Sequence, residues 1–131
     1  MRCFLLTVSQ GCVLDRYTNN FSLFSVLEEV TPTSYPARLD VNTVAFFLVD
    51  DRDRGTEHEV RLSVAHQGVE SFNSEPLAFT PTGARHRVRM NGLVLPEPGQ
   101  YEVRIDLRLK GTDSWSREPM SWPLTANTVM Q

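Results

Sequence analysis

Five arginines lie two or four residues apart in two successive segments of the chain. Arg85, Arg87 and Arg89 lie in RHRVRM, and Arg104 and Arg108 lie in YEVRIDLRLK. Alternate side chains of a strand point to the same face, and a guanidinium group binds carboxylate or phosphate through paired hydrogen bonds. If the two segments pair as antiparallel strands, as their short connection favours, the arginines form one cationic patch. Such a patch suits an acidic protein or a nucleic acid backbone.

The same face also has a purely structural interpretation. Glu102 and Asp106 lie among the arginines of the second segment, so cross-strand ion pairs of about 0.2–1 kcal/mol each could neutralise it. Nucleic acid binders usually show a clear basic excess and exposed stacking aromatics. This chain has 13 basic and 16 acidic residues, a formal net charge of −3. The ion-paired coat is therefore the favoured interpretation, and nucleic acid is only an alternative partner.

Trp115 is the other candidate binding residue. It lies in the polar stretch KGTDSWSREP, directly after the long alternating segment. A tryptophan in such a loop can contact a partner or stack against a sugar ring. It can equally fold back over one end of the core, and both alternatives stay open.

The acidic segment between Asp50 and Glu59 resembles the start of a calcium loop. Asp51 and Asp53 precede Gly55 at suitable spacing, but the remaining ligands of an EF-hand loop are missing. Arginines between the carboxylates would also repel a cation. A solvated turn over 50–57 is favoured, and whether the segment binds anything stays open.

Histidine and cysteine do not form a recognisable catalytic or metal-binding pattern. His58, His66 and His86 are far apart, and Cys3 and Cys12 lack the spacing of a zinc site. No nucleophile elbow or glycine-rich phosphate loop is present. We therefore predict no enzyme, no metal and no cofactor.

Hydrophobicity and thiol content indicate a cytoplasmic protein without a membrane partner. No apolar run approaches the ~20 residues of a membrane span, and the first apolar run is shorter than a signal-peptide core. In a reducing compartment we expect the two cysteines to remain thiols.

A period of two dominates the sequence and indicates strands. YEVRIDLRLK, EVRLSVAH and RHRVRM alternate between apolar and polar residues, which is typical of half-buried antiparallel strands. VNTVAFFLVD is apolar on both faces in its second half, as expected of a central strand. The last strand, REPMSWPLTA, should place Met120, Trp122 and Leu124 on one face, and its prolines predict an edge position.

Turn-forming residues separate these strands. YTNN, at 17–20, predicts a hairpin whose second arm could be a strand or a helix, and the strand is favoured. TPTSYPARL, at 31–39, predicts a connection between sheets or edges, and FTPTGAR, at 79–85, predicts another turn. Asn91 and Gly92 predict a bulge within one long strand over 85–95 rather than a hairpin turn.

These elements predict an all-β fold, an immunoglobulin-like antiparallel β-sandwich of about seven or eight strands. We expect a single domain over 1–125 and a C-terminal tail over 126–131.

Two resemblances accompany this prediction. Gly99 and Tyr101 resemble the Gly-x-Tyr corner of immunoglobulin-like domains, in which the tyrosine hydroxyl bonds back across a turn. The Thr18–Leu23 hairpin and the late PEPGQYEVRIDL strand resemble a family of short, uncharacterised bacterial β-sandwich proteins. This resemblance implies a stand-alone sandwich and transfers no catalytic residue.

The sequence as a whole favours a non-catalytic interaction module that binds another protein of unknown identity. Edge strands of a sandwich offer sites for strand addition. The candidate binding residues are Arg85, Arg87, Arg89, Arg104, Arg108 and Trp115. The alternatives are a carbohydrate or calcium module and a nucleic acid accessory protein that uses the arginines.

Overall fold

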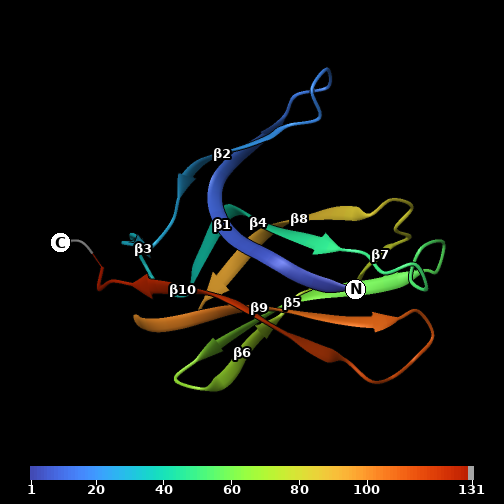
Figure 1. Cartoon of the computed structure of the whole chain (residues 1–131). Coiled ribbons are helices and arrows are strands. Elements are labelled where there is room, and N and C mark those ends of the chain that lie inside the picture. Colours follow the sequence, from blue (N-terminus) through green and yellow to red (C-terminus); the bar gives the residue numbers. More distant parts are fainter. Residues whose placement is uncertain (130–131) are drawn as a thin grey trace.

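Two β-sheets pack face to face in the computed structural model of the protein, which describes residues 1–129 (Figure 1). The smaller sheet has the strand order β2 (Phe21–Val26), β1 (Arg2–Leu14), β4 (Ala37–Leu48) and β8 (Arg85–Leu95). The larger sheet has the order β3 (Glu29–Val30), β10 (Ser116–Ala126), β9 (Gly99–Leu109), β5 (His58–His66) and β6 (Val69–Asn73). In that sheet β7 (Leu77–Phe79) also pairs with β5.

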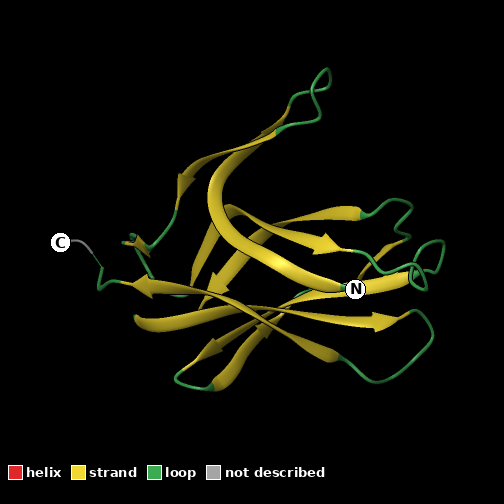
Figure 2. Ribbon diagram, viewed as in Figure 1, coloured by secondary structure: helices red, strands yellow, loops and turns green. Residues whose placement is uncertain are grey.

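The predicted all-β sandwich is confirmed, and Figure 2 shows strands joined by loops. Residues 1–129 form ten strands instead of the predicted seven or eight. The strands that the sequence did not indicate are the short β3, β6 and β7. Nearly every side chain of β6 is exposed, so an alternation of buried and exposed residues is missing there. The hairpin from β5 to β6 turns at Gln67 and Gly68, both with positive φ, as tight hairpins require. Within residues 1–129 no helix is long and apolar enough to cross a membrane.

The core lies between the sheets and follows the period of two. Val103 and Ile105 of β9 are fully buried, and β5 contributes Val60, Leu62 and Val64 to the same cluster. β4 lies between β1 and β8, as predicted for a central strand. It buries Val44 completely although this residue points away from the core, because the β1–β2 hairpin passes over it.

β8 is one continuous strand, and the irregularity in its pairing with β4 lies opposite Gly92. Leu39 pairs with Leu93 and Asn42 with Asn91, so two β4 residues oppose Gly92 alone. Gly92 adopts a φ of 89°, which glycine accepts without steric cost. The sequence NG therefore lies within one continuous strand and not in a hairpin turn, as expected, but the extra residue of the bulge is on β4 and Gly92 lies opposite it.

The hairpin at 15–20 and the strand that follows it are also as predicted. We call residues 11–24 the arm, because Figure 1 shows this hairpin standing out from the smaller sheet. Its tip is ordered by Asp15, whose Oδ1 accepts a hydrogen bond from the Tyr17 amide at 2.9 Å. Backbone amides of Tyr17 and Thr18 hold the pKa of the Asp15 carboxyl below its usual value. Asn19 takes the left-handed conformation with a φ of 58°.

The expectation that the two arginine-bearing strands pair with each other is wrong. β8 pairs with β4 in the smaller sheet, whereas β9 pairs with β5 and β10 in the larger sheet. The short connection over 96–98 crosses from one sheet to the other. Each strand then buries its apolar face against the opposite sheet. The two sets of arginines consequently point to opposite outer faces of the molecule.

The corner between β8 and β9 is tightly packed. The Tyr101 hydroxyl donates to the Glu97 carbonyl at 2.6 Å and accepts from the Glu97 amide at 3.2 Å. The His66 ring stacks on Tyr101 with 4.4 Å between ring centroids. A Cβ on Gly99 would lie 2.4 Å from Nε2 of His66, and the φ of Gly99 is 144°.

β10 lies next to the edge of the larger sheet, because only two residues of β3 pair with it in parallel orientation. Leu124 is buried and Trp122 donates to the Leu27 carbonyl at 2.7 Å. Met120 is exposed, because the β10 register shifts between Arg117 and Ser121. Strand structure continues to Ala126, at the start of the predicted tail, and residues 130–131 lie outside the described part.

We predict that Gly99→Ala destabilises the domain by about 2–4 kcal/mol, because it adds a steric clash to an unfavourable φ. Chemical denaturation measures this free energy of unfolding. Gly55→Ala is the matched control, since Gly55 has a φ of 76° and open space around its Cβ position. It should lose only about 1 kcal/mol. Equal losses in the two variants would contradict the packing described for the corner.

Candidate functional site

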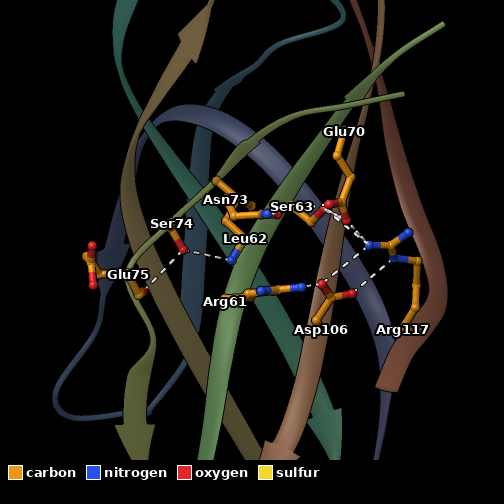
Figure 3. A network of polar contacts seen from close by, with 9 residues as sticks. All are labelled: Arg61, Leu62, Ser63, Glu70, Asn73, Ser74, Glu75, Asp106 and Arg117. Atoms are coloured by element: carbon orange, nitrogen blue, oxygen red, sulfur yellow. Dashed lines mark hydrogen bonds and ion pairs between the residues drawn. The ribbon is translucent and has the colours of Figure 1, made fainter. Parts of the chain in front are cut away.

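The outer face of the larger sheet is covered by ion pairs (Figure 3). Asp106 is only 1% exposed and lies between two arginines. Its Oδ2 is 3.0 Å from Nε of Arg61, and its Oδ1 is 3.0 Å from Nε of Arg117. Arg117 also contacts Glu70 at 2.8 Å, and this contact lowers the pKa of the Glu70 carboxyl. Three strands, β5, β9 and β10, are thus joined through one buried carboxylate.

Two of the candidate residues, Arg108 and Trp115, belong to this ion-paired face. Nε of Arg108 is 3.1 Å from Oε1 of Glu59. The Trp115 ring packs against two guanidinium groups, with its centroid 4.0 Å from Cζ of Arg108 and 4.5 Å from Cζ of Arg61. Cation–π contacts of this length stabilise the paired arrangement. Trp115 therefore packs on the outer face of the sheet rather than over one end of the core.

Arg104 lies on the same face, with Ser63 of β5 on one side and Ser121 of β10 on the other. It forms no ion pair with residues 1–129, and its Nε is buried without a hydrogen-bond partner there. Its position in the middle of the sheet separates it from the β8 arginines.

The three arginines of β8 have a different environment. Arg85, Arg87 and Arg89 lie on the outer face of the smaller sheet, on its edge strand. None of them forms an ion pair within the described part of the chain, and all of their observed partners are uncharged. Nη2 of Arg87 donates to Oδ1 of Asn19 at 2.9 Å, and Nη1 of Arg89 lies 3.6 Å from Sγ of Cys12.

The arm reaches across the sheet toward these arginines and leaves a cleft. Asn19 at the arm tip contacts Arg87, so the arm spans β4 to reach β8. Two adjoining hollows of about 390 and 450 Å³ lie on this face. Their shared wall is Phe21 on the arm and the segment Arg85–Arg87 on β8. We call this region the arginine cleft.

Aromatic rings line the arginine cleft. The Phe46 ring contacts Phe21 edge to face, at 5.8 Å between centroids, and Phe4 at 6.1 Å. Cζ of Arg87 lies 5.1 Å from the Phe21 ring, and Cζ of Arg85 lies 6.0 Å from the Phe4 ring. The planar guanidinium groups of Arg85 and Arg87 thereby lie close to apolar rings.

His86, between two of these arginines, borders the cleft, but its side chain lies on the inward face of β8. Its ring stacks on Phe79 at 4.6 Å. Burial lowers the pKa of His86 from its ordinary value of 6.5, so the imidazole is neutral at pH 7. The positive charge of the cleft therefore comes from arginine alone.

The carboxylates of the acidic turn, residues 50–57, do not converge on a common cation site. Asp50 and Asp53 both contact the amino group of Met1, at 2.7 and 2.6 Å. Asp51 pairs with Arg54 at 2.7 Å. Within residues 1–129 no group of three or more histidine, cysteine or acidic side chains is placed to hold a metal ion.

Sequence reasoning identified the β8 arginines but missed the residues that surround them. Phe4, Phe21 and Phe46 come from three strands, and each fits a core position when its own segment is considered alone. Asn19 was recognised only as a turn former. A weak signal was available, because Phe21 and the exposed Phe24 give the arm more apolar side chains than a solvated hairpin needs.

Comparisons with known proteins add little to this description. No protein-family model matches the chain, and no curated protein matches it. Among solved structures, the chain is similar to the CooA pilin subunit from enterotoxigenic Escherichia coli, with 14% sequence identity and a TM-score of 0.32. The match covers 93% of this chain and 98% of that chain. Likeness at this level supports no inference about residues or function.

We predict that Asp106→Asn lowers the free energy of unfolding by about 2–3 kcal/mol, because it leaves Arg61 and Arg117 without their shared carboxylate. Urea denaturation measures the change. Asp113→Asn, at an exposed loop position, is the control and should change stability by less than about 0.5 kcal/mol. If both variants are equally stable, Asp106 does not hold the larger sheet together as described.

Proposed function

We propose that this protein is a non-catalytic β-sandwich module that binds another protein through the arginine cleft. The observation that carries the proposal is the row of three β8 arginines without an acidic partner among residues 1–129. The partner is expected to be acidic where it contacts this row. We also propose a cytoplasmic setting, in which Cys3 and Cys12 remain thiols.

The contrast between the two outer faces supports the choice of surface. On the larger sheet Arg61, Arg108 and Arg117 are each neutralised by a carboxylate. On the smaller sheet Arg85 and Arg89 have exposed side chains and no such partner. Like charges along one strand repel one another, so an anionic partner relieves this repulsion as well as adding new ion pairs.

The chemistry of the cleft also suits a protein interface. Arginine and aromatic residues are enriched in the energetically important parts of such interfaces. The cleft combines three phenylalanine rings with three arginines. On the far side of the arm, Val13 and Phe24 are about half exposed, at 51% and 52%, and Tyr17 at the tip is fully exposed. These side chains offer further apolar contact area on the face of the arm that points away from the charged row.

We predict that Arg85→Glu/Arg89→Glu reduces the amount of partner captured from nuclease-treated lysate of the host by a factor of about ten or more. The tagged protein is used as bait, and mass spectrometry quantifies the captured proteins. The control is Arg38→Glu/Lys110→Glu, which makes the same change in net charge. Arg38 is exposed near the opposite end of β4, and Lys110 follows β9 in the other sheet.

Unchanged capture by the folded β8 variant would contradict the proposed surface. Loss of all captured proteins on nuclease treatment of the wild-type sample would favour nucleic acid instead. In that case binding should weaken steeply with added salt, because phosphate contacts release counterions.

A further inference from the structure

We propose that the partner contributes an acidic extended segment that adds as a strand to the free edge of β8. Its carboxylates would occupy alternate positions opposite Arg85, Arg87 and Arg89. This inference rests on the proposed function and specifies the chemistry of the partner at that site. It draws on three features of β8, namely its edge position, the spacing of its charges and the character of its inward face.

β8 presents a long unpaired edge. It is the last strand of the smaller sheet and pairs with β4 from Arg85 to Leu95, with one irregularity at the bulge. No strand of residues 1–129 pairs with its other side. The outward N–H and C=O groups of such a strand form a template for one more strand. Proline, which would block pairing, does not occur between Arg85 and Leu95.

The arginine spacing matches that of an extended chain. Alternate residues on a strand are roughly 6.5–7 Å apart, so the three arginines form a row with this repeat. A strand paired alongside β8 would present its own alternate side chains with the same repeat, directly opposite. Acidic residues at these positions would pair one to one with the arginines. Charged side chains also deter pairing with an identical edge, so the same row selects against a second copy.

The inward face of β8 indicates which residue types should alternate with the carboxylates in the added strand. Val88 and Met90 point to the core, and His86 is half-buried and neutral at pH 7. Side chains of an added strand that alternate with its carboxylates would lie beside these residues at the rim of the core. Apolar or β-branched side chains suit that environment. The structure thus favours a segment in which Asp or Glu alternates with residues such as Val or Thr.

The arm provides a boundary on the outer side. Asn19 at its tip lies over β8 and holds Arg87 at 2.9 Å, so the carboxylates of an added strand would come close to the arm tip. Nucleic acid fits this edge less well. The edge alternates donors and acceptors, whereas a phosphate backbone offers acceptors only at its charged groups.

The experiment uses synthetic peptides and the full chain. The peptide Thr-Glu-Val-Glu-Val-Glu-Thr is compared with its isomer Thr-Val-Glu-Glu-Glu-Val-Thr, which has the same charge and composition. Fluorescence polarisation of labelled peptides should show that the alternating peptide binds about tenfold more tightly than its isomer. Arg85→Glu/Arg89→Glu should remove this binding, and Arg38→Glu/Lys110→Glu should retain it.

Backbone methylation tests strand addition itself. In an extended strand the amides of the glutamates point to one edge and those of the valines to the other. N-methylation of one set should therefore abolish binding, and N-methylation of the other set should leave it intact. Full binding by both methylated peptides would overturn the proposal.

Equal affinities of the two isomeric peptides would also overturn the proposal of an added acidic strand. Tighter binding of oligo-dT of equal charge than of the alternating peptide would overturn it too. These outcomes remain distinct from failure of the proposed function, because that function is judged by capture of a protein from lysate. If capture depends on the β8 arginines but neither peptide binds, the protein-binding surface stands and the acidic strand is wrong.

Discussion

The constraint on which this structure depends is that each long strand has one apolar face, which only a second sheet can bury. β8 and β9 each bury their apolar face against the opposite sheet, and the connection over 96–98 passes from one sheet to the other. The alternating pattern thereby places β8 and β9 in opposite layers. Their polar faces, which are similar in sequence, then meet entirely different neighbours.

Those neighbours decide the chemistry of each face. The β9 arginines lie in the middle of a sheet, flanked by β5 and β10, and carboxylates from β5, β6 and β9 itself lie within reach of the basic groups there. Asp106 is buried among them and Trp115 packs on top. The β8 arginines lie at an edge, flanked on one side by the apolar and uncharged residues of β4. The arm brings Asn19, Phe21 and Cys12 into contact with them, and none of these side chains is charged. A stabilising charge network and an unpaired cationic row thus arise from the same residue type.

Local sequence predicted the features that depend on local chemistry. The β-sandwich, the central position of β4, the hairpin at Asn19 and the continuity of β8 through Gly92 all follow from periodicity and turn preferences. Local sequence could not predict the strand order, because a short connection can join two paired strands of a hairpin or two strands in different sheets. The expected merging of Arg87 with Arg104 failed for this reason. The aromatic lining of the cleft was missed because it needs the arm to bend across β4, which no local pattern encodes. Two placements of Trp115 were open, because the position of its ring is set by arginines from two different strands.

Amide hydrogen exchange on the complex with the captured partner tests the central claim, that the edge of β8 is the binding surface. If the partner binds this edge, the amides of β8 that point away from β4 gain protection, and exchange at the arm tip becomes slower. The amides of β9, β10 and β6 should exchange as in the free protein. Protection confined to the larger sheet, with β8 unchanged, would show that the partner binds elsewhere.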